Sequence, residues 1–161
     1  MVKNAVIEKK PASIFKRGFA YIIDVLIIDL IIVLPFNKTI KNLQGTDTFN
    51  FYYNFQYLLD NPEKTAQLAF IGIIVAVLSI AYWTILEFRL RQSIGKILMN
   101  IKVMSKKKGF SITQCLVRNI SKAITLLFLF DVIYLLINKD KNQRYFEKIS
   151  DTIVIEEVIK I

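Results

Sequence analysis

The sequence predicts an all-α membrane protein with two transmembrane helices, a third membrane-embedded segment that spans or re-enters, and a small juxtamembrane antiparallel β-element on the cytoplasmic side. Hydrophobic residues make up 54% of the 161 residues and are concentrated in long runs, unlike the mixture found in a soluble globule. Lys and Arg flank these runs, as expected of cytoplasmic loops. We expect one domain over residues 1–161, with membrane segments at about 18–36, 66–88 and 120–137.

The first span, Gly18 to Phe36, has thirteen Leu, Ile, Val or Phe residues among nineteen and is interrupted by Asp24 and Asp29. As a helix it is about 28 Å long, close to the thickness of the hydrocarbon core of a bilayer. Two carboxylates at about 2.5 to 3.5 kcal/mol each roughly cancel thirteen apolar residues at about −0.5 kcal/mol each. Insertion therefore requires the acids to find partners, become protonated or face water.

Arg17 precedes this span, after a polar and basic lead-in, Met1 to Lys16, in which Ser13 is expected to cap the helix. Arg17 and Asp24 are seven residues apart and share a helix face, but they are separated by about 10 Å along the axis. We expect a shared polar stripe and not a direct pair. Asp29 is rotated by about 140° from Asp24 and faces other surroundings.

The segment from Asn37 to Lys64 carries three Lys residues against three acids, so the charge pattern places it outside. Phe51, Phe55, Leu58 and Leu59 stand at helical spacing, and aromatic residues favour the headgroup boundary. An interfacial helix on the outer leaflet is predicted.

The Asn61–Pro62 pair is a typical helix start, and the second span follows from Ala66 to Phe88. The Tyr82–Trp83 pair near its far end is typical of an aromatic belt above a basic cytoplasmic flank. Glu87 is expected to pair with Arg91, four residues further on.

The segment from Gln92 to Thr113 is no longer a long apolar run. Its stretches IKVMS and FSIT alternate apolar and polar residues, and the turn-like KKKG separates them. This pattern predicts a β-hairpin. The run from Thr152 to Glu156 alternates in the same way and is expected to add a third strand, since an isolated hairpin is marginally stable. Gly95 is interpreted as the bend before the sheet, and Lys96 as a side chain that reaches headgroups or an acid.

The third apolar run, Ile120 to Ile137, contains Lys122 and Asp131. Five Lys or Arg residues precede the first span, eight lie between the second and third runs, and five follow the third. Three simple spans would place the last five outside, against the usual charge bias. Two alternatives stay open: a full span, or a segment that re-enters or folds as two short helices and returns to the cytoplasmic side.

Composition excludes several kinds of function. The net charge is +9, but no nucleic-acid-binding module accompanies it, so the bilayer and not nucleic acid is the expected partner. There is no His, and Cys115 is the single cysteine, which excludes internal disulfides, the usual zinc ligand sets and His-based catalysis. The stretch SIGK lacks the earlier Gly and the following Ser or Thr of a phosphate-binding loop. We expect no metal site, no cofactor and no enzymatic activity.

Four stretches, RGFAYIID, RQSIGKILMNIKV, QCLVRN and SDTIVI, resemble in order the motifs of the RDD family of small membrane proteins, named for one Arg and two Asp. The residues that carry the resemblance are Arg17, Asp24, Gly95, Lys96, Arg118 and Asp151. The chain departs from the pattern where Ser93 replaces Thr and where the small residue before the closing Thr is missing. The second family Asp is either Asp131 or Asp151, and Asp29 is an extra acid.

The resemblance implies a multi-pass protein of the cell membrane, and some members of the family are described as exchanging sodium or potassium for protons. Arg17, Asp24, Asp29 and Asp131 are therefore candidates for binding a monovalent cation or a proton, because intramembrane acids are rare and costly. Asp24 would be the carrier and Arg17 would adjust its proton affinity. Asp24 could equally be an acid that a basic residue neutralises to hold helices together.

Two functions are thus expected, with the N-terminus in the cytoplasm in either case. The first is cation transport coupled to protons, which would require a homo-oligomer because so few helices cannot easily enclose a pathway. The alternative is a non-transporting structural or assembly protein that binds another membrane protein or lipid. An aspartyl protease dyad of Asp24 and Asp131 is not expected, since neither acid has a flanking Gly.

Overall fold

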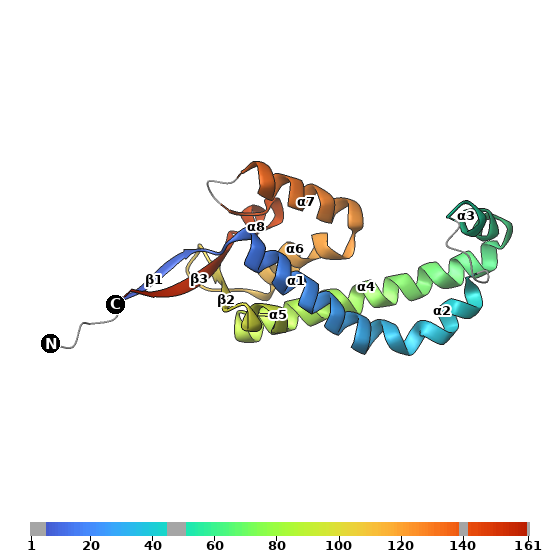
Figure 1. The fold of residues 1–161 in the computed structure, drawn as a ribbon, viewed down its shortest axis with the longest axis horizontal. Coiled ribbons are helices and arrows are strands. Elements are labelled where there is room, and N and C mark those ends of the chain that lie inside the picture. The colour runs from blue at the N-terminus through green and yellow to red at the C-terminus, as the bar shows by residue number, and fades with distance from the viewer. Residues whose placement is uncertain (1–5, 45–50, 139–141, 161) are drawn as a thin grey trace. The chain divides into compact units, whose positions relative to one another are not determined.

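The structure is a computed structural model that describes residues 6–44, 51–138 and 142–160. Its elements are β1 (Val6–Pro11), α1 (Ile14–Ile28), the π-helix η1 (Asp29–Val33), the 3-10 helix η2 (Leu34–Phe36), α2 (Asn37–Leu43), α3 (Phe51–Asp60), α4 (Pro62–Leu90), α5 (Ile94–Leu98), β2 (Ile101–Ser105), α6 (Ile112–Ala123), α7 (Thr125–Ile137), α8 (Tyr145–Ile149) and β3 (Thr152–Lys160) (Figure 1). They form two compact parts, residues 1–26 with 80–161 and residues 27–79.

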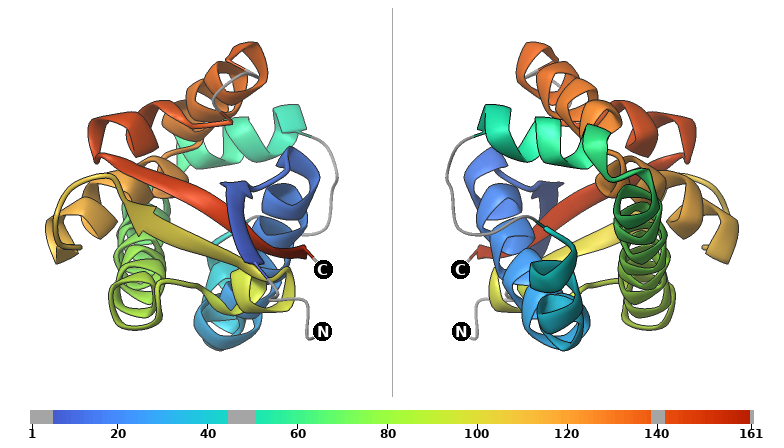
Figure 2. Two further views of the ribbon diagram at one scale, coloured as in Figure 1. Left: turned by 90° about the vertical axis from the view of Figure 1, so that its left-hand side faces the viewer. Right: turned by 90° about the vertical axis from the view of Figure 1, so that its right-hand side faces the viewer.

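The first part contains an antiparallel sheet in the order β1-β3-β2. Figure 2 shows β3 in red between β1 in blue and β2 in yellow. The predicted third strand is therefore the central one, and the lead-in supplies an edge strand that ends at Pro11, opposite Ile155. Pro is tolerated there because an edge strand does not need every N–H in its ladder. Buried apolar side chains of the sheet, of α1 and of the link between β1 and α1 form a small core: Ala12, Ala20, Ile101 and Val154.

The predicted hairpin is wrong in its second strand. Ser111 and Gln114 form a capping box, in which each side chain accepts a hydrogen bond from the other residue's backbone N–H, and α6 begins at Ile112. The cap provides hydrogen-bond acceptors for the backbone N–H groups of Ser111 and Gln114, which in a strand would have to bond to a neighbouring strand. β2 pairs instead with β3, where Val103 lies opposite Val154.

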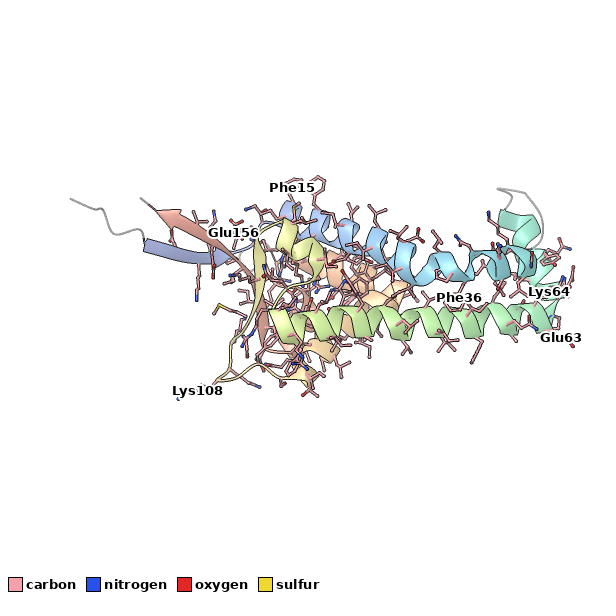
Figure 3. All side chains as sticks on the ribbon, turned by 90° about the horizontal axis from the view of Figure 1, so that it is seen from below. Phe15, Phe36, Glu63, Lys64, Lys108 and Glu156 are labelled. Atoms are coloured by element: carbon pink, nitrogen blue, oxygen red, sulfur yellow. The ribbon has the colours of Figure 1, made fainter. Side chains whose placement is uncertain are left out.

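The structure confirms two helices long and apolar enough to cross a membrane, Ile14–Leu43 and Pro62–Leu90. Only 17% of the most apolar window of each is buried within the protein, as expected of surfaces that face lipid. The Ser13 hydroxyl accepts a hydrogen bond from the Lys16 amide at 3.3 Å and caps α1, as predicted. Phe15, in the first turn, points away from the protein and is 82% exposed (Figure 3).

The second part comprises the irregular end of the first span, α2, α3 and the first two-thirds of α4. The chain passes from a π turn at Asp29–Val33 to a 3-10 turn at Leu34–Phe36. Pro35 lacks an N–H and cannot continue an α-helical ladder, which accounts for the change of winding. The helix predicted around Phe51 and Phe55 is present as α3, although those two side chains lie outside the described ones.

The third apolar run forms two short helices and not one straight span. α6 and α7 meet at Ile124, which has extended backbone angles, and their axes differ by 105°. α7 alone is about 20 Å long and too short for the hydrocarbon core. Together the two helices are long and apolar enough to form either a broken span or a re-entrant loop, so a straight third span is excluded.

Candidate functional site

Asp24 on α1 is buried, and each oxygen of its carboxylate accepts two hydrogen bonds. Oδ1 accepts from the Gly95 amide at 2.8 Å and from the Tyr82 hydroxyl at 3.0 Å. Oδ2 accepts from the Ser93 hydroxyl at 2.5 Å and from the Trp83 indole N–H at 3.3 Å. A carboxylate has about four lone-pair sites, so this one is saturated, and all four donors are uncharged. Asp24 thereby ties α1 to the end of α4 and to α5.

Gly95 is positioned by close contact with α1. A β-carbon added to Gly95 would lie 2.0 Å from the carbonyl oxygen of Ala20, so no larger residue fits without a shift of backbone. Gly95 lies inside α5, and the chain turns earlier, at Arg91, whose φ is +61°. The prediction that Gly95 marks the bend is therefore wrong; its missing side chain permits helix contact.

Glu87 near the end of α4 is fully buried and has four polar partners from later elements. Its carboxylate forms ion pairs with Lys96 and with Arg118 Nε at 3.1 Å, and accepts a hydrogen bond from Asn119 Nδ2 at 2.9 Å. Lys122 Nζ lies 3.6 Å from the same carboxylate. The predicted local pair with Arg91 is wrong, because the buried face of α4 turns Glu87 toward α5 and α6.

Glu147 on α8 joins three arginines. Its carboxylate is 2.7 Å from Arg17 Nη2, 3.2 Å from Arg118 Nη2 and 3.0 Å from Arg144 Nε. Burial alone would raise the pKa of Glu147, but the three positive charges together lower it below its usual value. Arg17 also donates from Nη1 to the carbonyl oxygen of Asn142 at 2.7 Å, so its guanidinium binds α8 and the chain before it and not Asp24.

Asp131 on α7 is buried as well. It accepts hydrogen bonds from the Ser121 hydroxyl at 2.7 Å and from the Phe146 amide at 3.0 Å, and Arg144 Nη1 lies 3.5 Å away. Burial lowers the pKa of Arg144, but the negative charges of Glu147 and Asp131 outweigh this and raise it above its usual value. Asp131 therefore fastens α7 to α6 and α8.

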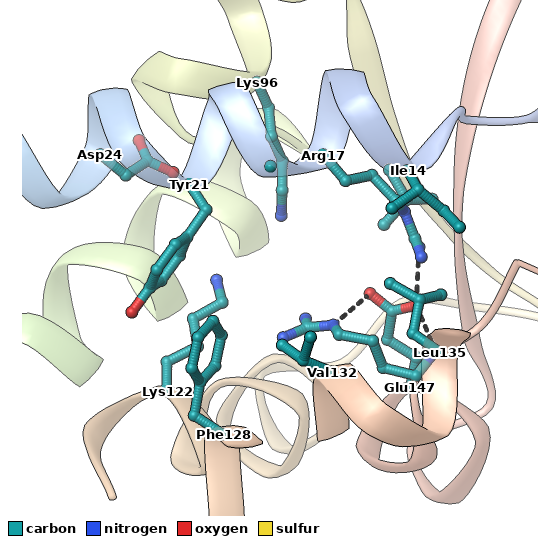
Figure 4. A pocket seen from close by; sticks show the side chains of 13 residues that line it. Ile14, Arg17, Tyr21, Asp24, Lys96, Lys122, Phe128, Val132, Leu135 and Glu147 are labelled. Atoms are coloured by element: carbon teal, nitrogen blue, oxygen red, sulfur yellow. Dashed lines mark hydrogen bonds and ion pairs between the residues drawn. The ribbon is translucent and has the colours of Figure 1, made fainter. Parts of the chain in front are cut away.

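A cavity of about 140 Å³ lies among these groups, bounded by α1, α5, α6, α7, α8 and β3; we call it the basic cavity (Figure 4). Its charged lining residues are Arg17, Asp24, Lys96, Lys122, Arg144 and Glu147. Four cations thus face two carboxylates. Burial lowers the pKa of Lys96 to about 8, although Glu87 opposes the shift. No group of three His, Cys, Asp or Glu residues suited to a metal ion occurs in the described part of the chain.

Most of the chain matches a known protein family. The model of the RDD family matches residues 11–151. The chain belongs to the RDD family. No curated protein and no solved structure matches it. Membership and the two long apolar helices together identify an integral membrane protein.

In this RDD protein, residues of separate motifs meet in space. Arg17 from the first motif and Arg118 from the third share Glu147, and Asp24 from the first contacts Gly95 from the second. Lys96 pairs with an acid, Glu87, which is one of the two contacts predicted for it. Most of the motif residues therefore connect α1 to other elements of the first compact part, residues 1–26 with 80–161.

Two predicted site residues stand apart from the cluster. Asp29 lies on η1, is exposed, and has no polar partner among the residues that the structure describes. Asp151 lies in the turn before β3 with a φ of +50° and forms an ion pair of 2.5 Å with Lys107. Neither acid contributes to the basic cavity.

Sequence reasoning missed Glu147 and Arg144 entirely and gave Glu87 the wrong partner. The only signal for the first two was their spacing of three residues, which suits a capping pair at the start of a helix. α8 has five residues in a polar stretch, so no hydrophobic periodicity marked it. The sequence also gave no indication that Asp24 accepts hydrogen bonds from Tyr82, Trp83 and Ser93.

Proposed function

We propose that this RDD protein is a non-transporting membrane protein whose buried polar cluster assembles one end of the membrane domain and holds a further membrane component. The observation that carries this proposal is the saturated carboxylate of Asp24. A residue that bound and released cations would need free lone pairs, whereas both oxygens of Asp24 are occupied.

The donors around Asp24 also differ from the ligands of a cation site. Hard cations are bound by oxygen lone pairs. The Gly95 amide and the Trp83 indole N–H offer hydrogens and have no lone pair for a cation. The excess of Lys and Arg in the basic cavity adds repulsion for any cation.

Cation transport coupled to protons is the other function, and it is motivated by family membership and by the intramembrane acids. A test uses inverted vesicles with a pH gradient, to which Na⁺, Li⁺ or K⁺ is added. We expect no dissipation by the wild type beyond that of empty vesicles. Dissipation that requires the wild-type carboxylate, and is lost in Asp24→Asn, would overturn the proposal and would call for a homo-oligomer that encloses a pathway.

A second measurement tests the assembly role directly. Asp24→Asn should lower the amount of folded protein recovered in mild detergent, since an amide nitrogen would face donors where an oxygen now accepts. Asp29→Asn is the matched control, because Asp29 is exposed and makes no polar contact in the described residues. Equal recovery of both variants would contradict the assembly role.

The distribution of Lys and Arg residues supports one orientation in the membrane. We infer that the protein lies in the cell membrane with its N-terminus in the cytoplasm, since basic residues concentrate before the first span and after the second. In intact cells, an impermeant thiol reagent should label Lys64→Cys and should not label Lys10→Cys. The reverse pattern would overturn this orientation.

A further inference from the structure

Two lysines from different elements point into the basic cavity. Figure 4 shows the ammonium groups of Lys96 on α5 and Lys122 on α6 directed into the same hollow from opposite sides. Their side chains are 9% and 4% exposed, so bulk water does little to screen them. Both ammonium groups approach the same oxygen of Glu87, which Lys96 pairs with directly and Lys122 approaches to 3.6 Å, so one carboxylate oxygen is shared by two like charges.

The surrounding carboxylates do not balance this charge. Five cations whose side chains are at most 11% exposed share the carboxylates of Glu87, Asp131 and Glu147: Arg17, Lys96, Arg118, Lys122 and Arg144. The fourth carboxylate, Asp24, receives all of its hydrogen bonds from uncharged donors. Five cations against four carboxylates leave a surplus of one positive charge, and four of the five cations line the basic cavity.

Lys122 is the least satisfied of these cations. Its ammonium lies 3.6 Å from Glu87 and 4.5 Å from the centre of the Trp83 ring, and it donates no hydrogen bond to the described residues. The buried Nε of Arg17 likewise has no hydrogen-bond partner there. Burying a cation without hydrogen-bond acceptors is costly, so an oxygen-rich anion bound in the cavity would stabilise these donors.

The remaining wall of the cavity is apolar. Ile14 on α1 and Phe128, Val132 and Leu135 on α7 line it. A volume of about 140 Å³ exceeds the space for one water, which needs roughly 10 to 15 Å³ on the same measure. An occupant with both a charged and an apolar portion fits this wall better than a free, hydrated ion.

Residues that line or adjoin the cavity stand at the ends of the two long apolar helices. Arg17 is in the first turn of the span Ile14–Leu43, and Glu87 is in the last turn of the span Pro62–Leu90. The ends of spanning helices meet the interfacial region of the bilayer. We propose that the basic cavity binds the phosphate of an anionic phospholipid, held by Lys96 and Lys122, with the acyl chains along the apolar wall of α1 and α7.

The proposed function includes a further membrane component, and this inference identifies that component as an anionic phospholipid. The inference therefore rests on the proposed function. The test is native mass spectrometry and thermal unfolding of the delipidated protein in detergent, with phosphatidylglycerol, phosphatidylcholine of the same acyl chains, or inorganic phosphate added. We expect one phosphatidylglycerol per chain and a raised Tm, with phosphatidylcholine at least about fivefold weaker and inorganic phosphate without effect.

Variants assign the binding to the cavity. Lys122→Gln should weaken phosphatidylglycerol binding by about fivefold, and Lys122→Arg should retain it. Lys102→Gln is the matched control, because Lys102 pairs with Glu157 on the surface of the sheet. If Lys122→Gln fails to fold, Val132→Trp, which fills the cavity from the apolar side, should abolish binding while the charges stay intact.

Several outcomes would overturn the inference. Equal binding of both lipids, or unchanged binding in Lys122→Gln and Val132→Trp, would show contact with the general lipid-facing surface. If inorganic phosphate raised the Tm as much as the lipid does, the site would bind a free anion. If no probe raised the Tm, the cavity would bind no anion and would hold only water. Cation flux in the vesicle assay would overturn the proposed function alone, whereas loss of lipid preference without flux would overturn only this inference.

Discussion

Gly95 lies so close to the carbonyl oxygen of Ala20 that a β-carbon on Gly95 would come within 2.0 Å of it. The same contact brings the Gly95 amide to 2.8 Å from Asp24. One small residue thus sets both the packing of α5 on α1 and a hydrogen bond of the buried acid.

Gly95→Ala should therefore lower the free energy of unfolding by about 3 kcal/mol or more, since the backbone must move to admit the methyl group. The control is Gly72→Ala, because a β-carbon at Gly72 meets nothing within 4 Å and Ala favours helix. Thermal unfolding in detergent measures both variants. A Gly95→Ala protein as stable as Gly72→Ala would contradict the close contact.

Glu87→Gln should destabilise this part of the protein strongly, by about 3 to 5 kcal/mol, because it leaves buried Lys96, Arg118 and Lys122 without their shared charge. Cys115 is a natural reporter, since it is buried on the neighbouring α6. A thiol reagent should label it much faster in this variant than in the wild type.

The control for this variant is Glu157→Gln. Glu157 pairs with Lys102 at 3.1 Å, and both side chains are at least one-third exposed, so about 0 to 1 kcal/mol is expected. If both variants label Cys115 at the wild-type rate, Glu87 is not the centre of a buried cluster.

Glu147 should make stability depend on pH. Its pKa in the folded protein is below the ordinary value of 4.5, so the stabilisation is complete above about pH 4.5 and is lost as the pH falls further. In Glu147→Gln, the fall of Tm between pH 6 and pH 3 should be shallower than in the wild type, from a lower starting value. Parallel curves for the two proteins would refute the role of this carboxylate.

Asp24 should tolerate change less well than Asp29, although both acids lie on the first span. Asp24→Asn forces donors to face an amide nitrogen and should cost about 1 to 3 kcal/mol for each unsatisfied group. Asp29→Asn removes an exposed charge that has no partner in the described residues and should not reduce stability. Denaturation of the two variants side by side measures the difference, and a reversed order would exclude the tie between α1 and α5.

Much of the fold followed from local patterns. The two spans, the cap at Ser13, the helix at Phe51–Asp60 and the strand at Thr152 were all predicted, because apolar length, capping residues and alternation act over short distances. The predicted hairpin did not form, since the cap of Ser111 and Gln114 starts a helix where alternation suggested a strand. Apolar–polar alternation favours a strand at this position and the capping box favours a helix, and the structure has the helix.

By itself, the sequence determined that this is a membrane chain of the RDD family, with Arg17 and Asp24 on one face of its first span. Only the tertiary structure decided that the two residues take different partners, Glu147 for Arg17 and the donors of α4 and α5 for Asp24. The reason is physical. A buried charge is stabilised by whichever groups the packing brings within about 3 Å, and those groups come from segments more than fifty residues away in the chain.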